Sequence, residues 1–311
     1  MSLVPLSDIL NLPAQISTRE HKNALAFVFN SDFLVGFQVL CYSLAVHRTL
    51  TDLPILIITE DKVVLDDPFV RMVADKTKLA TEEEIRSFSS ISSEKVDKRL
   101  QLEWIPKYTY MKWLMFDDYG FDNLIFIDTD IVCLNSIDEL DELNGADLFG
   151  CPVFSKDIIS KREELLGTDA SDQSIKDFSC SEHPAGSRLN TGVMVVGDKL
   201  LTETFRKGLI EYAEAGSFSV EQAALREYIR KKTSFRMEMI SPLYNFKHDF
   251  IQLLSVKSQV EIISRVKLLH YAGAAGKPWE TRAPTTLSDF IWHCYYNEAK
   301  DKLDDLVIDL I

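Results

Sequence analysis

The sequence predicts an α/β protein with a mostly parallel sheet that is flanked by helices. Two short apolar runs, 24–29 and 54–59, enclose a stretch in which apolar residues recur with helical spacing, which is the order of a β-α-β unit. Such a crossover connects parallel strands, so the unit indicates a parallel sheet. Of the 311 residues, 46% are hydrophobic, which is enough for one large domain with a sizeable core.

Further apolar runs continue the same alternation along the chain. We expect strands at 124–127, 147–153, 191–196 and from 268 onward. The last of these leads into a glycine-containing loop. We expect an exposed helix and loop within 81–99, and helices at 104–116, 200–214, 219–231 and 287–311. The last of these is amphipathic. Ser136 followed three residues later by Glu139 predicts a further helix start with a capping box.

The polar stretch 154–188 interrupts this alternation, and we interpret it as a variable insertion. The simplest domain organisation is one main domain over residues 1–283, followed by a C-terminal helical extension over 284–311. No internal repeat and no low-complexity linker divides the chain further.

The charge of the chain disfavours polyanionic partners. A formal net charge of −14 repels the phosphates of nucleic acid and the anionic surface of a membrane. The mildly basic stretch 226–236 is typical of the solvated end of a helix. We therefore expect no nucleic-acid partner.

Five cysteines are present, and none of their spacings is that of a zinc site or a redox motif. Cys41, Cys133 and Cys151 lie in apolar runs, so we predict buried thiols in a reducing compartment. No segment reaches about 18 consecutive apolar residues, and residues 1–15 lack the pattern of a signal peptide. The cytoplasm is the expected location, without a transmembrane segment.

The segment LIFIDTDIVCL, residues 124–134, carries the strongest indication of chemistry. A buried strand delivers Asp128 and Asp130 to its C-terminal end, where open α/β sheets bind ligands. In a fully extended chain both side chains would point to one spot. Two neighbouring carboxylates repel each other unless a cation lies between them, and hard oxygen ligands suit Mn²⁺ or Mg²⁺.

This motif alone leaves other interpretations open. Both aspartates could cap a following helix at the surface. The order Asp128-Thr129-Asp130-Ile131-Val132 also matches the strand-DxDx[TV] pattern of haloacid-dehalogenase-like phosphatases, in which the first aspartate is a covalent nucleophile. A later GDxxxD motif is missing, however, because Gly197-Asp198 is followed by Lys-Leu-Leu-Thr.

Further segments follow one another along the chain together with the DTD segment. They are residues 26–44 (AFVFNSDFLVGFQVLCYSL), Lys112, residues 189–195 (LNTGVMV), Glu221-Gln222 and residues 269–279 (LHYAGAAGKPW). In this order they resemble glycosyltransferases of family 8, the glycogenin-like retaining enzymes with a GT-A fold, and the resemblance spans about residues 24–279. Each motif is weak by itself, and their common order carries the resemblance.

The resemblance implies a nucleotide-binding GT-A domain over residues 1–283 that transfers a hexose from a UDP-sugar to an acceptor hydroxyl with retention of configuration. It implies that Mn²⁺ (or Mg²⁺) is held by Asp128, Asp130 and His270. It implies catalytic roles for Glu221, Gln222 and Lys277. The donor would be bound by Asn30, Ser31, Phe33, Lys112, Asp128, Thr129, Asp130, Asn190, Gly273 and Lys277, with Asn245 as a weaker candidate at the sugar.

The chain departs from the family pattern at some of these positions. Glu221 replaces the usual Asp, and one extra residue lies between His270 and Lys277. Phe33 stands where the family often has a tyrosine that stacks on uracil, and a phenylalanine can stack but lacks the hydroxyl. Trp279 is as well explained by packing as by function.

The acceptor is not readable from the sequence, and a glycan, a lipid-linked sugar and a protein all remain open. The acidic C-terminal residues 301–311 favour recruitment by a protein over a membrane surface. A homodimer remains open as well, and so does a non-catalytic protein that only binds nucleotide sugars. Glucose and galactose are equal expectations for the donor sugar.

Overall fold

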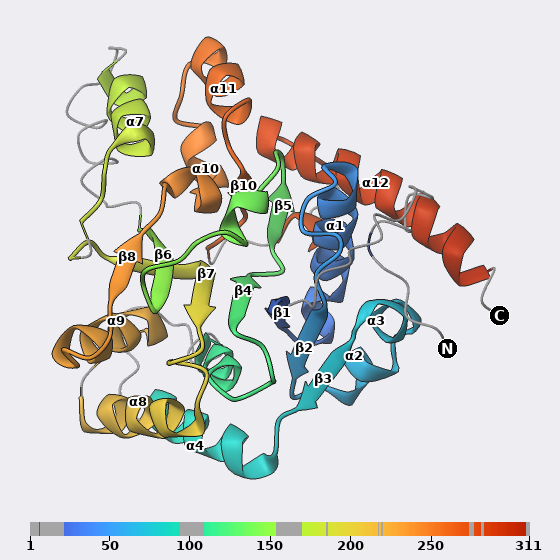
Figure 1. Ribbon diagram of the computed structural model, residues 1–311. Coiled ribbons are helices and arrows are strands. Elements are labelled where there is room, and N and C mark those ends of the chain that lie inside the picture. The colour runs from blue at the N-terminus through green and yellow to red at the C-terminus, as the bar shows by residue number, and fades with distance from the viewer. Residues whose placement is uncertain are drawn as a thin grey trace.

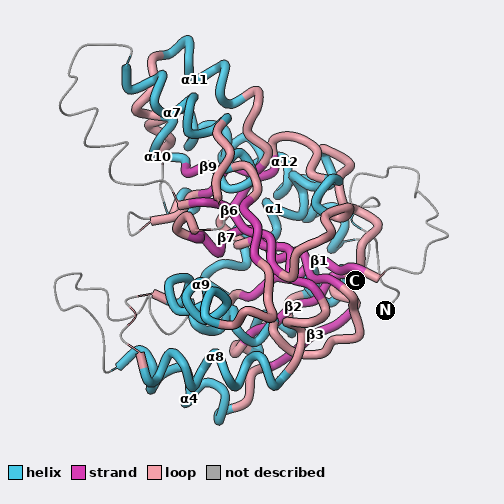
Figure 2. The backbone as a smooth tube through the Cα atoms, turned by 60° about the vertical axis from the view of Figure 1, so that its left-hand side comes forward, coloured by secondary structure: helices cyan, strands magenta, loops and turns pink. Residues whose placement is uncertain are grey.

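The structure is a computed structural model, and it describes residues 6, 22–93, 109–153, 170–184, 186–216, 218, 220–273, 277–280 and 283–308. A seven-stranded sheet with helices on both faces forms the body of the molecule, and a small three-stranded sheet lies beside it (Figure 1). The backbone tube in Figure 2 shows the strands crossing the centre, with helices above and below them.

The seven-stranded sheet has the order β3-β2-β1-β4-β7-β6-β8. Strand β7 runs antiparallel to both of its neighbours, and the other pairings are parallel. The expected mixed, mostly parallel sheet is therefore confirmed. The strands are β1 (Asn23–Val28), β2 (Ile55–Thr59), β3 (Lys76–Leu79), β4 (Asn123–Ile127), β6 (Leu148–Pro152), β7 (Leu189–Gly197) and β8 (Met237–Met239).

The helices agree in place with most of those expected from the sequence. They are α1 (Leu34–Val46), α2 (Lys62–Asp66), α3 (Pro68–Val73), α4 (Glu82–Ser93), α7 (Ala170–Cys180), α8 (Glu203–Ala215), α9 (Glu221–Lys231), α10 (His248–Ile251), α11 (Val256–Ile263) and α12 (Leu287–Ile308). Short 3₁₀ helices are η2 (Ser31–Phe33), η3 (Lys112–Met115), η4 (Asp138–Leu140), η5 (Pro242–Asn245) and η6 (Pro278–Glu280). Part of the expected insertion is thus helical, while residues 94–108 and 154–169 lie outside the described part.

Alternation along the strands sends side chains to two separate cores. On β1, Leu25 and Phe27 pack with residues of α1, α3 and α12, whereas Ala24 and Ala26 pack with residues of α4, α8 and α9. Successive side chains of a strand point to opposite faces, so a strand buried on both faces reads as a continuous apolar run. This explains why the run at 24–29 lacks an alternating pattern.

The small sheet consists of β5 (Ile131–Cys133), β10 (Leu268–His270) and β9 (Phe246–Lys247). Its centre is β10, which pairs antiparallel with β5, so that His270 lies opposite Ile131. Strand β5 begins directly after the DTD segment. This sheet therefore joins the late segment around residue 270 to the segment that carries the two aspartates.

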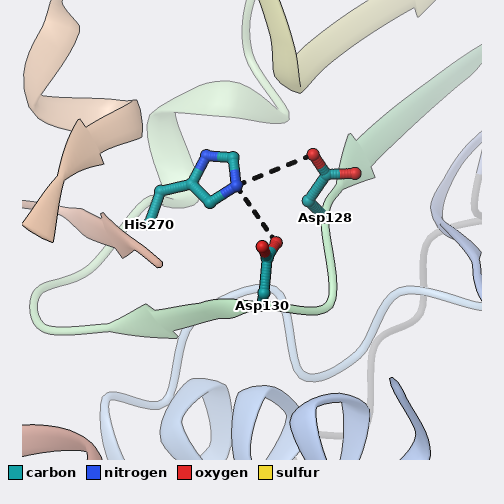
Figure 3. A group of neighbouring side chains, drawn as sticks. All are labelled: Asp128, Asp130 and His270. Atoms are coloured by element: carbon teal, nitrogen blue, oxygen red, sulfur yellow. Dashed lines mark ion pairs between the residues drawn. The ribbon is translucent and has the colours of Figure 1, made fainter. Parts of the chain in front are cut away.

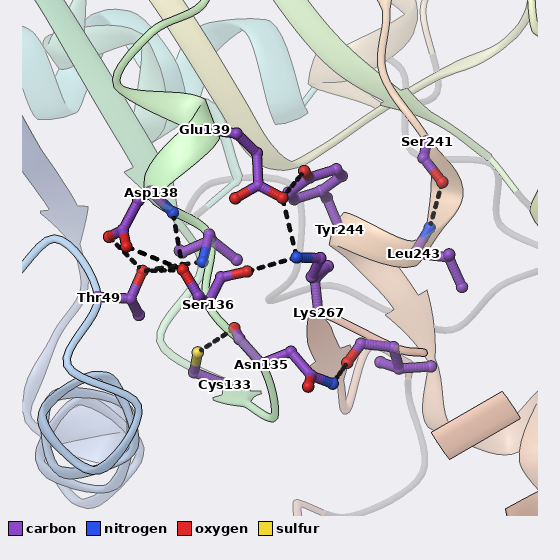
Figure 4. Close-up of polar contacts among 12 residues, drawn as sticks. Thr49, Cys133, Asn135, Ser136, Asp138, Glu139, Ser241, Leu243, Tyr244 and Lys267 are labelled. Carbon is purple, nitrogen blue, oxygen red and sulfur yellow. Dashed lines mark hydrogen bonds and ion pairs between the residues drawn. The ribbon is translucent and has the colours of Figure 1, made fainter. Parts of the chain in front are cut away.

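The expected capping box at Ser136 is wrong. The helix that follows is the 3₁₀ helix η4, whose N-cap is Ile137, and no side chain caps it. Glu139 instead accepts a hydrogen bond from the Tyr244 hydroxyl and pairs with Lys267, whose Nζ lies 2.9 Å away (Figure 4). The carboxylate thus stabilises a contact between distant segments rather than a helix start.

Helix α12 lies across α1 (Figure 1). The Tyr42 hydroxyl donates to Glu298 at 3.1 Å, and His47 Nε2 lies 2.8 Å from the Tyr295 hydroxyl. Among the described residues, no helix combines the length and the apolar character that crossing a bilayer requires. The division of the chain at 283/284 stays a prediction.

A buried ion network joins α4 to α8 below the sheet. Arg206 on α8 is only 8% exposed and places its guanidinium 2.8 Å from Glu84 and 3.2 Å from Asp117. Lys78 Nζ lies 3.2 Å from the Glu84 carboxylate, and the Thr81 amide donates a hydrogen bond to the same carboxylate at 2.8 Å. Burial opposes the charge of Glu84, but these donors outweigh it and lower the pKa of the carboxyl to about 2.

We expect Glu84→Gln to lower the free energy of unfolding by about 2 kcal/mol at pH 7, because it leaves the Arg206 charge partly unpaired. The folded pKa of Glu84 is below the unfolded one, so its stabilisation is complete above pH 4.5 and is lost as the pH falls through about 2. Urea unfolding at pH 7, 4 and 2.5 measures this trend. Glu82→Gln, on the same helix but 94% exposed, is the control with an expected change below about 0.5 kcal/mol. A loss of stability in Glu84→Gln that is as large at pH 2.5 as at pH 7 would contradict the lowered pKa of Glu84.

Candidate functional site

The DTD segment forms a turn between β4 and β5, not the extended chain that the sequence suggested. Asp128 follows the last residue of β4, and its amide donates to the Gly192 carbonyl on β7 at 2.8 Å. Asp130 comes directly before β5, and its carbonyl accepts from the Tyr271 amide at 2.9 Å. The two sheets therefore fix the two ends of the turn independently.

His270 meets both aspartates at this turn (Figure 3). Its Nε2 lies 3.0 Å from Asp130 Oδ1 and 3.8 Å from Asp128 Oδ2. The imidazole is 3% exposed and Asp130 is 7% exposed. One ligand atom from each of the three residues lies within 4.8 Å of the other two, which is the spacing of a shared metal shell.

Asn245 sets the orientation of the histidine ring. Its Oδ1 lies 2.6 Å from His270 Nδ1, and its Nδ2 donates to Asn190 Oδ1 at 2.8 Å. An amide oxygen only accepts, so Nδ1 carries the proton and Nε2 faces the carboxylates. The sequence suggested Asn245 for the sugar, whereas the structure buries it behind the histidine.

Two lysines compensate the carboxylates. Lys112 Nζ lies 2.8 Å from Asp128 Oδ2, and Lys277 Nζ lies 2.6 Å from Asp130 Oδ2. Burial would raise the pKa of Asp130, but His270 and Lys277 hold it well below its usual range. Burial, aided by the charge of Asp130, raises the pKa of Asp128 in spite of Lys112. The site thus combines concentrated negative charge with two cations that a ligand can engage.

A cavity of about 450 Å³ opens beside this cluster at the C-terminal ends of β1 and β4. Two of the proposed site residues do not line it. The Ser31 amide donates to Asp61 instead, and Asn245 lies behind His270. The proposed residues that do line it are Asn30, Phe33, Lys112, Asp128, Thr129, Asp130, Asn190, Glu221, Gln222, His270, Gly273 and Lys277. Residues from six separate segments of the sequence therefore share one cavity.

Glu221 enters the cavity as the first residue of α9. The Thr191 hydroxyl donates to Glu221 Oε1 at 2.7 Å, and Glu221 is 4% exposed. Burial opposes the charge of Lys112, but Asp128, Glu221 and Asp130 outweigh it and raise the pKa of the ammonium. Lys112 therefore lies in the field of all three carboxylates.

Two glycines that the sequence did not single out allow close contacts at the site. A Cβ on Gly192 would lie 2.6 Å from His270 Cε1 and 3.0 Å from Asn245 Nδ2. A Cβ on Gly36 would lie 2.4 Å from the Thr129 carbonyl oxygen and 3.1 Å from the Trp279 ring. The sequence could have indicated both positions, because a glycine inside an apolar strand or helix often marks a place where another part of the protein comes close to the backbone.

Comparison with protein families agrees with this arrangement. A family model described as glycosyl transferase family 8 matches residues 24–283, which is most of the chain. The chain belongs to glycosyl transferase family 8. It is therefore a glycosyltransferase, and the phosphatase interpretation of the DTD segment is wrong.

One curated relative of this family 8 enzyme is the lipopolysaccharide 1,2-glucosyltransferase of Escherichia coli. The two are 24% identical over 306 residues, which cover 94% of this chain and 84% of the relative. This similarity extends beyond the segment that the family model matches.

Solved structures show the same fold at low sequence identity. The glycosyltransferase GlyE of Streptococcus pneumoniae superposes with a TM-score of 0.56 at 16% identity, over 93% of this chain and 64% of that chain. The present chain thus spans somewhat less than two thirds of GlyE. The galactosyltransferase LgtC gives a TM-score of 0.54 at 15% identity, over 89% of this chain and 95% of that chain. The GT-A-like fold expected from the sequence is confirmed.

Proposed function

We propose that this family 8 glycosyltransferase transfers a hexose from a UDP-sugar to an acceptor hydroxyl, with a divalent cation held by Asp128, Asp130 and His270. The observation that carries the proposal is the convergence of these three side chains at the wall of a cavity, flanked by two partly buried lysines. We propose a hexose as the transferred sugar because the names of two relatives describe a glucosyltransferase and a galactosyltransferase.

The donor set suits Mn²⁺ or Mg²⁺. Two carboxylate oxygens and one imidazole nitrogen are ligands that such ions accept, and Asn245 already holds the ring with Nε2 toward the carboxylates. When bound, the cation would act as a Lewis acid that stabilises charge on the departing nucleoside diphosphate.

The residues of the chain have separate roles in the proposed reaction. Lys277 and Lys112 offer point charges to the diphosphate on either side of the carboxylates. Phe33 offers an aromatic face to the base, and Lys277 Nζ lies 5.6 Å from the centre of its ring. Electrostatic stabilisation of the leaving group is the largest expected contribution to the rate.

The resemblance to retaining enzymes implies that the acceptor replaces the diphosphate with retention of configuration. In one route the acceptor hydroxyl attacks from the face that the diphosphate leaves, and a departing phosphate oxygen takes its proton. In the other route the Glu221 carboxylate, with Gln222 beside it on α9, displaces the diphosphate and forms a glycosyl ester. The acceptor hydroxyl then displaces Glu221 from the sugar and loses its proton to a phosphate oxygen of the released diphosphate. Isolation of a glycosylated Glu221 peptide would decide for the second route.

The acceptor is a glycan, a lipid-linked sugar or a protein in this proposal. We place the enzyme in the cytoplasm, because Cys41, Cys133 and Cys151 are buried free thiols that fit a reducing compartment.

A thermal-shift experiment tests the proposal directly. UDP-glucose and UDP-galactose are each added with and without Mn²⁺, and at 100 times the dissociation constant the bound state gains about 2.7 kcal/mol. We expect the midpoint to rise by about 5 °C with one of these donors, only when Mn²⁺ is present. Release of UDP from that donor then shows turnover. Shifts that are the same with and without Mn²⁺, or that are missing with both, would contradict the proposal.

A further inference from the structure

Helical structure begins at Ser31, beside the cavity. The 3₁₀ helix η2 covers residues 31–33 and continues directly into α1. The first amides of a helix have no partner within the helix, and an asparagine before them usually provides one through its side-chain oxygen. Asn30 stands at this position, but its side chain caps no amide of η2. The partner of the Ser31 amide therefore comes from another part of the chain.

Asp61, in the turn between β2 and α2, is this partner. Its Oδ2 accepts a hydrogen bond from the Ser31 amide at 3.1 Å, while its Oδ1 accepts one from the Val63 amide at 2.9 Å and so caps α2. The Asp61 amide in turn donates to the hydroxyl of Thr59, the buried last residue of β2, at 3.0 Å. One carboxylate thus ties the start of η2 to the sheet.

The hydrogen bonds to Asp61 keep its carboxylate charged. A hydrogen bond from the Ser31 side chain is the largest cause that lowers the pKa of Asp61, and the Val63 and Ser31 amides lower it further against the effect of burial. The carboxylate is therefore ionised at neutral pH. A negative charge at the start of a helix is favoured by the helix dipole, which strengthens the contact with η2.

Asn30 is left with an acceptor that it does not use. It lines the cavity, and its Oδ1 is buried and has no hydrogen-bond partner within the described part of the chain. Buried polar atoms are rarely left without a partner, so this atom points to a donor group on a ligand. Phe33, the last residue of η2, lines the same cavity. In the proposed function this segment holds the base of the nucleotide sugar.

We propose, on the basis of the proposed function, that Asp61 is a positioning residue for the base of the donor. It holds the Ser31 amide from outside, which fixes the segment 30–33 and leaves the Asn30 side chain available to an N–H group of the base. Ser31, which the sequence placed at the donor, serves this role through its backbone and does not line the cavity. Asp61 does not line the cavity either, so it acts on the donor through this segment.

Equilibrium binding of UDP and ADP in the presence of Mn²⁺ tests this proposal, because the two nucleotides share the ribose and the diphosphate and differ in the base. For the native protein we expect UDP to bind at least about tenfold more tightly than ADP. In Asp61→Ala, UDP should bind about fivefold more weakly while ADP stays within about twofold, because the contacts to the base are lost. General damage to the fold would instead weaken both nucleotides alike.

Asp67→Ala is the matched control for the loss of a helix cap. Asp67 caps α3 by accepting a hydrogen bond from the Val70 amide at 3.1 Å, so this variant removes an N-cap carboxylate a few residues further along the chain. We expect its affinity for UDP to stay within about twofold of that of the native protein.

Combination with Asn30→Ala shows through which residue Asp61 acts. The side chain that Asp61 leaves available to the base is then gone. Adding Asp61→Ala to Asn30→Ala should therefore weaken UDP binding by less than about twofold further, which makes the two losses non-additive.

Four results would overturn the inference. They are UDP binding by Asp61→Ala that is as tight as native, equal losses of UDP and ADP binding in this variant, an equal loss of UDP binding in Asp67→Ala, and additive losses in the double variant. A native protein that binds UDP no more tightly than ADP would contradict the proposed function instead, and the measurement on the native protein alone recognises it.

Discussion

Replacing Asp130 with asparagine is expected to abolish the Mn²⁺-dependent thermal shift and to lower the rate of UDP release by about a thousandfold. Asp130 lies 3.0 Å from His270 Nε2 and 2.6 Å from Lys277 Nζ, so it touches both a proposed metal ligand and a proposed diphosphate ligand. An asparagine keeps the shape of the side chain but removes the charge that binds a divalent cation. The rate is measured as UDP released from the donor that gives the thermal shift.

The variant must be shown to fold, because it leaves Lys277 buried without its carboxylate partner. We expect a loss of about 2 to 3 kcal/mol in the free energy of unfolding, measured in urea at pH 7. Asp122→Asn, which removes an exposed carboxylate beside Lys22, is the control and should keep the shift and the rate. A folded Asp130→Asn protein that retains the Mn²⁺-dependent shift would show that the cation binds elsewhere.

Replacing Gly192 with alanine is expected to lower the affinity for Mn²⁺ about 10- to 100-fold, although this residue carries no ligand atom. The added Cβ would lie 2.6 Å from Cε1 and 2.8 Å from Nδ1 of His270. His270 is buried in a close-packed interior, so its ring must shift away from residue 192, which disturbs the position of Nε2 beside the two carboxylates. That movement also breaks the 2.6 Å contact between His270 and Asn245.

Gly186 offers a matched control, because a Cβ there would meet no atom within 4 Å. Titration of Mn²⁺ by thermal shift should separate Gly192→Ala from Gly186→Ala, with the latter close to the native protein. Equal Mn²⁺ affinities of the two variants would mean that the histidine is not held in place by this contact.

The apolar runs of the sequence were enough to predict those strands that are buried on both faces. The runs at 24–29 and 124–127 became β1 and β4, because a strand buried on both faces needs apolar residues at each position. Strand β3 was not expected, since its sequence KTKL is polar and half exposed. Strand β5 has three residues, too few for any period to show.

The sequence named the three side chains that meet at the DTD turn, but not the residues that support them. Asp128 and Asp130 stood out as two carboxylates at the end of a buried strand, whereas His270 was implied by the family resemblance. Asn245 and Gly192 act through contacts with His270 that join segments far apart in the chain, and a single sequence does not show which segments meet. The failed capping box has the same cause, because Lys267 and Tyr244 compete for Glu139.

The pairing of β5 with β10 has a consequence for how the enzyme matures on the ribosome. Lys277 is 147 residues later in the chain than Asp130, which it contacts. At about 5 to 20 residues per second, the DTD turn is translated about 7 to 30 s before its histidine and lysine partners emerge. During that interval Asp130 lacks both of these partners, whereas Asp128 can already pair with Lys112, which is translated earlier. The ability to bind the donor is thus acquired in the closing stage of synthesis, so a prematurely terminated chain has no competent site.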